Sequence, residues 1–379
     1  MILFYSCIGL LFAYGILFQY YGSWWKQFPA FTETGNPAGE DACTISVIIP
    51  ARNEAANIEA CLRSICRQNY PAHLFQVIVI DDGSEDDTFS IAGKVQEAGI
   101  QIICHRLAPI ANNRAPKKRA IETGIGMASG ELIVTTDADC IAAPGWLSCI
   151  AACHRQTNNV FIAAPVKIQD GASLLSKFQA LDFLTMQGIT AAAVFKRFHN
   201  MCNGANLAYE KKVFHEVGGF AGIDTIASGD DMLLMRKVAE KYPLQLGYLK
   251  AEAAVVTTLP ADGWKAFLQQ RIRWASKAAH YNHRGILLVL LLVYFTNLFI
   301  FSFLLLGLWY RFSLALFLLL CMAKFFMELF FVKDTAAFFK QQHLVPWLLL
   351  LQPLHITYIV VSGFLGQFKT YNWKGRKLK

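Results

Sequence analysis

Long apolar runs occupy both ends of this chain, and in the middle short apolar runs alternate with amphipathic segments. Ile2–Tyr21 is an uncharged apolar run of about 20 residues, the length needed to cross the hydrocarbon core of a bilayer. Three more apolar segments follow the middle part, at Ile286–Tyr310, Phe312–Val332 and Leu344–Gly366. The pattern therefore predicts one membrane helix before the middle part and up to three after it.

The middle part predicts an α/β fold. Thr44–Ile49 and Gln76–Ile80 are short, continuous runs rich in β-branched residues, typical of parallel strands covered on both faces. Between them, Ala55–Gln68 repeats its apolar positions at helical spacing. Further elements are expected as a helix at Asp87–Ala98, a strand at Ile100–His105, a helix at Arg119–Ala128 and a strand at Glu131–Thr135. This βαβαβαβ order predicts an open, mostly parallel sheet with right-handed crossovers.

The chain is expected to have five parts. They are an uncleaved membrane anchor (1–25), an α/β domain (43–260), an interfacial amphipathic helix (261–284), a membrane region (285–368) and a basic tail (369–379). Lys26 and the tail both favour the cytoplasmic face, which predicts a cytoplasmic α/β domain. Three full crossings would put the tail on the opposite face. We therefore expect one incomplete crossing, at the third segment, where Pro346 and Pro353 interrupt the apolar run.

The composition supports a membrane location. Apolar residues make up 55% of the chain and charged residues 16%, against about 25% charged in average soluble proteins. The net charge of +8 does not indicate nucleic acid, because no basic stripe interleaved with aromatic residues lies away from the membrane segments. The ten cysteines form no pairs at zinc-ligand spacing, and we expect them to act as small apolar side chains.

Acidic residues follow several of the predicted strands. Ligands of open α/β sheets bind beyond the carboxyl ends of the strands. Pro50–Glu54 follows the first strand, Asp81–Ser84 the second, and Asp137–Asp139 a later one. Four aspartates gathered at one edge would repel one another unless a cation offsets their charge. A divalent metal bound together with a diphosphate is the simplest arrangement that does so.

Each motif also has an ordinary structural interpretation. Asp81–Gly83 could form a simple turn, with the following residues capping a helix. Gly229–Asp231 could be an acidic helix N-terminus. Gln270–Trp274 lies on the basic amphipathic stretch Trp264–His280, which is typical of an interfacial helix. The three clusters at successive strand ends favour a common functional site because they occur together, and the two later clusters add to this.

Together these motifs resemble those of the family 2 glycosyltransferases, an inverting group with the GT-A fold. The group includes cellulose, chitin and hyaluronan synthases and ceramide glucosyltransferase. The resemblance covers Thr44–Trp274 and extends to Trp373–Arg376 in the tail. It implies a GT-A catalytic domain with membrane helices on both sides.

The resemblance also implies roles for individual residues. Contacts with the nucleotide sugar are expected from Pro50, Ala51, Asn53, Glu54, Asp82, Lys117, Asp137 and Ala138. Asp139 is expected to bind Mg²⁺ or Mn²⁺, and Asp231 to be the general base. Contacts with the acceptor and the diphosphate are expected from Asn206, Asp230, Gln270, Arg273 and Trp274. Asp230 stands where the family usually has Glu, and Pro116 where it usually has Gly, so local geometry at both positions is in question.

The expected reaction is metal-dependent transfer of a sugar from a UDP-sugar donor, with inversion, to a hydroxyl of a lipid or glycan acceptor at the membrane. A processive polysaccharide synthase is the alternative within the same family. A nucleotidyltransferase or a non-catalytic membrane scaffold is the alternative of a different class. The motifs at Asp139, Asp231 and Gln270–Trp274 disfavour a scaffold, which needs none of them.

Overall fold

The computed structural model describes residues 2–32, 43–108, 115–226, 228–277, 284–368, 371–373 and 376–378. Its contacts divide the chain into two units. The α/β unit consists of Pro29–Lys167, Asn200–Leu259 and Trp373–Lys379. The helical unit consists of Met1–Phe28, Ile168–His199 and Pro260–Asn372. Of the predicted basic tail, residues 369, 370, 374, 375 and 379 lie outside the described residues.

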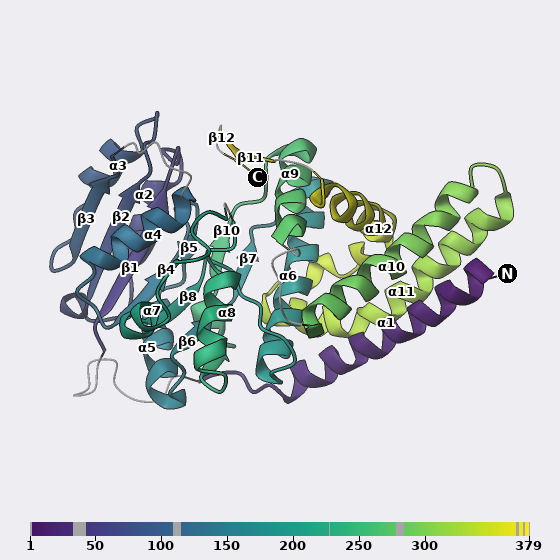
Figure 1. Ribbon diagram of the computed structural model, residues 1–379, viewed down its shortest axis with the longest axis horizontal. Helices are drawn as coiled ribbons and strands as arrows, with labels where there is room; N and C mark the ends of the chain where they lie inside the picture. Colours follow the sequence, from purple (N-terminus) through teal and green to yellow (C-terminus); the bar gives the residue numbers. More distant parts are fainter. Residues whose placement is uncertain are drawn as a thin grey trace. The chain divides into compact units, whose positions relative to one another are not determined.

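A mixed seven-stranded sheet forms the centre of the α/β unit (Figure 1). Its order is β3 (Gln101–Arg106), β2 (Phe75–Asp81), β1 (Ile45–Ala51), β4 (Leu132–Thr135), β8 (Leu207–Glu210), β6 (Phe161–Ala163) and β9 (Leu246–Tyr248). β8 runs antiparallel to both its neighbours, and the other pairs are parallel. The predicted α/β class with a mostly parallel sheet is confirmed.

Helices cover this sheet, and a small second sheet accompanies it. The helices are α2 (Ile58–Cys66), α3 (Thr88–Lys94), α4 (Pro116–Met127), α5 (Trp146–Thr157), α7 (Lys211–Glu216) and α8 (Met232–Lys241). The second sheet has the order β5 (Ile141–Ala142), β10 (Val256–Thr258), β7 (Val166–Ile168). Every residue of β2 is buried, as expected of a strand covered on both faces. α4 approaches β1 so closely that a Cβ on Gly124 would lie 2.7 Å from Ile48 Cγ2.

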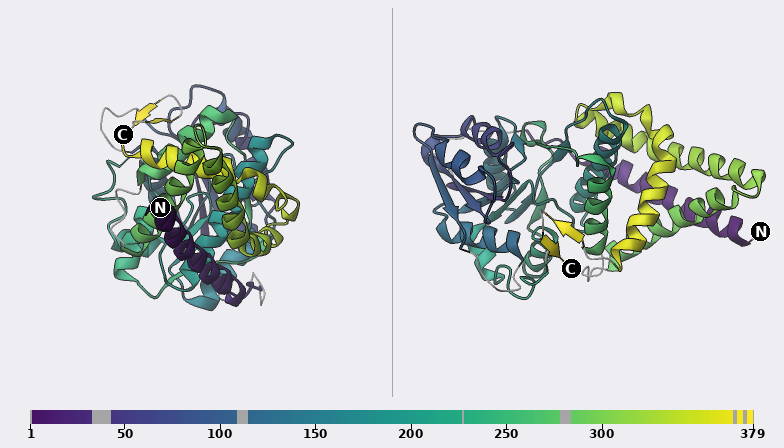
Figure 2. Two further views of the ribbon diagram at one scale, coloured as in Figure 1. Left: turned by 90° about the vertical axis from the view of Figure 1, so that its right-hand side faces the viewer. Right: turned by 90° about the horizontal axis from the view of Figure 1, so that it is seen from above.

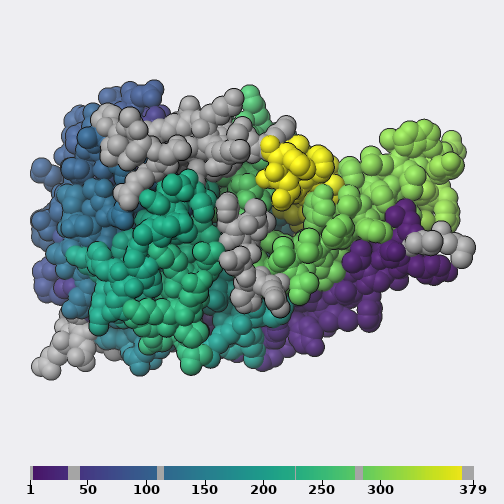
Figure 3. Space-filling view, in the orientation of Figure 1, coloured from purple at the N-terminus to yellow at the C-terminus, as the bar shows by residue number. Residues whose placement is uncertain are grey.

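The helical unit contains α1 (Ile2–Gln27), α6 (Leu174–Phe195), α9 (Gly263–Ser276), α10 (Arg284–Leu306), α11 (Arg311–Phe338) and α12 (Trp347–Gly366). Among the described residues, α1, α10, α11 and α12 are long and apolar enough to cross a membrane. α1, α10 and α11 run side by side (Figures 2 and 3). Leu11, Ile300, Leu320 and Ile356 belong to the apolar core among these helices. Large apolar side chains such as Phe12 and Phe330 are exposed on the outside, as lipid-facing residues are.

α12 differs from the expectation that prolines interrupt the third apolar segment. Pro346 is the N-cap of the helix, where a missing N–H costs nothing, and the helix continues through Pro353 to Gly366. Near the second proline, the Thr357 hydroxyl donates to the Pro353 carbonyl at 2.7 Å. An internal proline leaves the carbonyl four residues earlier without its helical N–H donor, a loss that membrane helices tolerate. The two prolines therefore do not break α12, and an incomplete crossing at this segment stays a prediction.

α6 is grouped with the apolar helices rather than with the sheet. It contacts α1, α11 and α12, and it packs closely on α11 because a Cβ on Gly188 would lie 2.7 Å from the Thr335 side chain. The predicted domain over 43–260 is continuous in sequence, whereas the α/β unit is interrupted by Ile168–His199. This grouping reflects the composition of α6, which is apolar around most of its circumference.

Charged side chains are buried within the apolar helices. Lys324 and Glu328, four residues apart on α11, form an ion pair at 2.6 Å and are 0% and 4% exposed. Gln352 of α12 contacts both, accepting from Lys324 at 2.9 Å and donating to Glu328 at 2.5 Å. The hydroxyl of Tyr14 on α1 also donates to Glu328. One polar cluster therefore links three helices that are far apart in sequence.

Candidate active site

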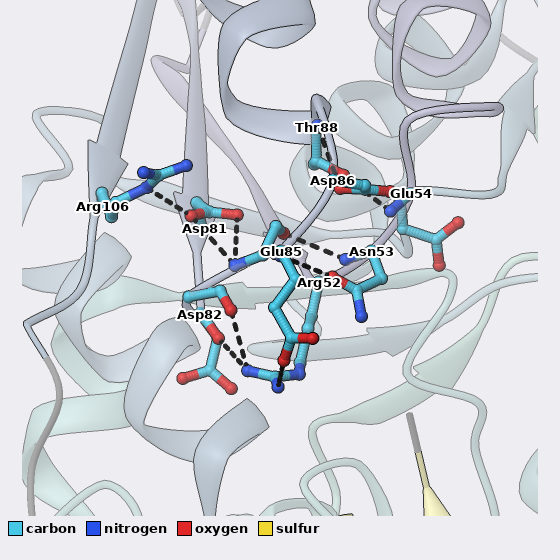
Figure 4. Close-up of polar contacts among 11 residues, drawn as sticks. Arg52, Asn53, Glu54, Asp81, Asp82, Glu85, Asp86, Thr88 and Arg106 are labelled. Carbon is cyan, nitrogen blue, oxygen red and sulfur yellow. Dashed lines mark hydrogen bonds and ion pairs between the residues drawn. The ribbon is translucent and has the colours of Figure 1, made fainter. Parts of the chain in front are cut away.

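Arg52 braces the ends of the two central strands (Figure 4). It follows β1, and its Nη1 donates to the backbone carbonyls of Asp82 and Gly83 at 2.7 and 3.0 Å. Its Nη2 lies 3.2 Å from the exposed carboxylate of Glu85. The backbone N–H of Asp82 in turn donates to Ala51 at 2.9 Å. These contacts fix the turn that carries Asp82, one of the residues expected to contact the nucleotide.

Asp81 and Asp82 have different environments. Asp81 is fully buried, forms an ion pair with Arg106 at 2.9 Å and accepts from the Ser84 N–H at 3.3 Å. The turn interpretation is therefore right for Asp81. Asp82 is 7% exposed, and Figure 4 shows its carboxylate pointing away from the Asp81–Arg106 pair.

Asn53 and Glu54 bind the same turn through their backbones. The N–H of Asn53 donates to Ser84 Oγ at 3.0 Å, and the N–H of Glu54 donates to Thr88 Oγ1 at 2.7 Å. The Asn53 side chain accepts from the Glu85 N–H at 2.9 Å. Asn53 has a φ of 50°, a left-handed conformation that asparagine tolerates better than most residues. Pro50 and Ala51 end β1 beside this turn.

Lys117 connects two of the predicted acidic motifs. Its Nζ lies 2.6 Å from Asp137 Oδ1 and 3.3 Å from Asp230 Oδ2. Burial disfavours its charged form, but Asp137, Asp230 and Asp231 together raise the pKa of Lys117 above its ordinary value. Its ammonium therefore stays charged at neutral pH. α4, which begins at Pro116, thus supplies a fixed cation between the residues after β4 and those before α8.

Asp231 and Gly204 complete this cluster. Asp231 is the N-cap of α8 and is 8% exposed. Its Oδ1 accepts from the Met232 N–H at 2.7 Å, and its Oδ2 accepts from the Gly204 N–H at 3.2 Å. A Cβ built on Gly204 would lie 3.0 Å from Asp230 Oδ2 and 3.4 Å from Lys117 Nζ. The glycine therefore lies directly against both charged groups.

The variant Gly204→Ala should slow catalysis. The added methyl group forces the Asp230 carboxylate or Lys117 to move by a few tenths of an ångström. We expect kcat to fall by about 10-fold, since a misplacement of about 1 Å can cost about 100-fold. The matched control is Gly126→Ala on α4, where a Cβ meets nothing within 4 Å. Steady-state kinetics of the two variants test this, and equal kcat values would contradict it.

Asp139 lies two residues after Asp137, in the segment that follows β4. Its Oδ2 accepts from Thr258 Oγ1 of β10 at 3.2 Å, and its Oδ1 is 3.5 Å from Cys140 Sγ. No group of three or more His, Cys, Asp or Glu in the described part of the chain could hold a metal ion by itself. Mg²⁺ in phosphate-transfer sites needs only one or two carboxylates, since phosphate oxygens and water supply the remaining ligands. Asp139 therefore fits a cation shared with a bound diphosphate.

Asn206 differs from its expected role in contacting the acceptor. The side chain is fully buried, and its Nδ2 donates to the Pro165 and Ala254 carbonyls at 2.8 and 2.9 Å. Its Oδ1 accepts from Trp146 Nε1 at 2.8 Å. Both amide protons are used, so Asn206 positions the loop between β8 and Gly204 and does not face an acceptor.

The remaining predicted residues lie on α9 of the helical unit. Gln270 Oε1 is buried and has no hydrogen-bond partner among the described residues, which suits a group that receives a ligand. The ring of Trp274 stacks near Arg271, whose guanidinium carbon is 4.2 Å from the ring centroid. Contacts of Gln270, Arg273 and Trp274 with the acceptor and the diphosphate remain a prediction.

Arg271, within the same motif, was not identified from the sequence. It is 3% exposed and forms an ion pair at 2.8 Å with Asp182 of α6, which also accepts from the Tyr358 hydroxyl of α12 at 2.6 Å. This pair fastens α9 to two neighbouring helices. A basic residue in an amphipathic stretch carries no signal that its partner lies on another helix.

Comparison with known proteins identifies relatives of this chain. Residues 46–222 match the model of glycosyl transferase family 2. Glycosyltransferase AglE of Haloferax volcanii is 27% identical over 233 residues, which cover 60% of this chain and 71% of AglE. Poly-beta-1,6-N-acetyl-D-glucosamine synthase of Staphylococcus aureus is 25% identical over 238 residues, covering 61% of this chain and 53% of the synthase.

A solved structure supports the same fold. The mannosyltransferase PcManGT from Pyrobaculum calidifontis, in complex with GDP-Man and Mn2+, aligns with a TM-score of 0.58. The alignment covers 97% of both chains at 17% identity. At this identity the likeness concerns the fold alone, and it extends over the apolar helices as well as the sheet.

Proposed function

We propose that this chain, whose residues 46–222 match glycosyl transferase family 2, transfers one sugar from a UDP-linked donor to a hydroxyl of a lipid or membrane-proximal acceptor. The cluster of Lys117, Asp137, Asp230 and Asp231 carries this proposal. It combines a fixed cation for a diphosphate with a buried carboxylate for the nucleophile. Asp137 follows β4, which pairs in parallel with β1, itself beside β2, and ligands of such sheets bind beyond the carboxyl ends of the strands.

The proposed reaction is direct displacement at the anomeric carbon of the sugar. Asp82 and the ends of β1 and β2 bind the nucleoside, and Lys117 balances negative charge on the diphosphate. Asp231 accepts the proton of the attacking acceptor hydroxyl, as one carboxylate does in inverting glycoside chemistry. Mg²⁺ or Mn²⁺ bound at Asp139 would supply further charge stabilisation for the departing diphosphate. Arg273 is a second candidate cation for that diphosphate.

The helical unit favours a single transfer over polymer synthesis. Lys324 and Glu328, the charged residues that could line a polar path, are buried and bonded to one another and to Gln352. Side chains already satisfied within a bundle are poor candidates for contacts with a moving glycan. Similarity to a poly-N-acetylglucosamine synthase keeps processive synthesis as the second candidate.

We also propose that the four apolar helices anchor the chain in a membrane with the catalytic domain on the cytoplasmic side. Their length and composition suffice for crossing. Lys26, directly after the apolar part of α1, supports that orientation through the preference of Lys and Arg for cytoplasmic loops.

A donor screen tests the proposed function. The purified protein in detergent is incubated with a panel of UDP-sugars and GDP-mannose, bacterial or archaeal lipid extract, and Mn²⁺ or Mg²⁺. We expect one UDP-sugar to be consumed with release of UDP and with a lipid product that carries a single sugar. A ladder of longer glycans would select the processive alternative, and release of pyrophosphate would identify a nucleotidyltransferase.

A further inference from the structure

A buried lysine next to Lys117 holds the loop that leads to Asp231. The Nζ of Lys118 donates to the backbone carbonyls of Ile223, Ile226 and Ser228 at 2.8, 2.7 and 3.0 Å. The side chain is 2% exposed. An ammonium group has three N–H donors, and here each has a carbonyl acceptor. A buried charge is stable only when its hydrogen-bonding groups are satisfied in this way.

The position of this contact matters because the loop ends at the catalytic carboxylates. Ser228 is followed by Gly229, which has a φ of 80°, and then by Asp230 and Asp231. A second bond joins the same segments, since the Ala115 N–H donates to the Asp224 carbonyl at 2.7 Å. The first turn of α4 thus makes two kinds of contact. Lys117 binds the acidic side chains, and Lys118 binds backbone carbonyls of the loop that precedes Asp230.

A second lysine makes a similar contact at the other end of the loop. Lys237 of α8 donates to the carbonyls of Gly219 and Ala221 at 2.7 and 2.9 Å, and more weakly to Gly218 at 3.4 Å. It is partly exposed, and the carbonyls it holds lie at least nine residues before Asp230. Lys118 and Lys237 therefore both donate to backbone carbonyls of this loop, but Lys237 binds carbonyls farther along the chain from Asp230 and Asp231. Lys237 is a matched control for Lys118.

We propose that Lys118 is a positioning residue for the proposed glycosyl transfer. By binding the carbonyls of Ile223, Ile226 and Ser228, it sets the Asp231 carboxylate against the Gly204 N–H and Asp230 against Lys117. Lys118 touches neither donor nor acceptor and acts through Asp231. The proposal rests on the assignment of Asp231 as general base.

The variants Lys118→Met and Lys237→Met separate this role from general stability. Methionine keeps an unbranched side chain but removes the donors. For Lys118→Met we expect kcat to fall by about 100-fold, the cost of roughly 1 Å of misplacement, while the Kd for the UDP-sugar changes by less than about 3-fold. For Lys237→Met we expect kcat within about 3-fold of the parent. Turnover is expressed per donor-binding site, so that unfolded protein does not count.

Lys118→Arg covers the case in which the methionine variant fails to fold. Arginine keeps the charge, but its planar guanidinium cannot present three donors to three converging carbonyls. We expect a folded protein with normal donor binding and a kcat lowered by about 10-fold. An unchanged kcat in Lys118→Arg or Lys118→Met, or an equal loss in Lys237→Met, would overturn the proposal. If Asp231→Asn is itself fully active, the base assignment fails instead, which distinguishes the two failures.

Discussion

Asp231→Asn is expected to abolish sugar transfer, with kcat reduced at least about 1,000-fold, while the UDP-sugar still binds. General base catalysis contributes typically about 100- to 10,000-fold, and a carboxamide cannot accept the hydroxyl proton. The side chain keeps its size, so the N-cap position of α8 stays filled. Binding of the donor is measured by calorimetry, and transfer by release of UDP.

The control for this variant is Glu240→Gln on the same helix. Glu240 has a largely exposed side chain that forms an i,i+4 ion pair with Arg236 at 3.6 Å, and ion pairs near the surface contribute little to stability. We expect this variant to retain kcat within about 2-fold. If Asp231→Asn turned over normally, another group would have to accept the proton, and the role of the whole carboxylate cluster would need revision.

Removal of divalent metal is expected to abolish activity, and addition of Mn²⁺ or Mg²⁺ to restore it. Two negatively charged groups, the donor diphosphate and the Asp139 carboxylate, would lie close together beyond the carboxyl end of β4. Lys117 is already held by Asp137 and Asp230, so one lysine does not neutralise both. Metal ions at such sites contribute several kcal/mol of charge stabilisation, which corresponds to losses of more than about 100-fold.

The metal prediction has a second measurement that does not depend on turnover. Mn²⁺ should bind the protein tightly only when UDP is present, because Asp139 alone supplies too few ligands. Asp139→Asn should weaken that UDP-dependent binding at least about 10-fold. Full activity after treatment with EDTA and dialysis into metal-free buffer would rule out the proposed cation.

Sequence periodicity predicted the sheet because its central strands are buried on both faces. Thr44–Ile49 and Gln76–Ile80 agree with β1 and β2 to within two residues at each end. Lys117 joins Asp137, which follows β4, to Asp230. The expected convergence of Asp137 and Asp139 with Asp82 at the strand ends stays a prediction. These features depend on local pattern and on sheet topology, which sequence carries well.

Features that depend on backbone acceptors or distant partners were not predictable in this way. Arg52 and Lys118 bind carbonyl oxygens, and every residue has one, so no side-chain pattern marks the partner. Arg271 pairs with Asp182 across two helices, a tertiary contact with no local signal. Asn206 was expected to contact the acceptor from its place in a motif, and no sequence pattern marks that its amide instead binds Trp146 and two backbone carbonyls.

The polar cluster around Lys324 has a consequence for biogenesis. Tyr14 and its partner Glu328 are 314 residues apart, so at about 5–20 residues per second α1 emerges from the ribosome tens of seconds before its partner. With the membrane placement proposed above, the neighbouring Lys324–Glu328 pair lets α11 insert without net charge from these two residues. Gln352 arrives only with the final helix. Translation must therefore be nearly complete before α1, α11 and α12 can form this polar cluster.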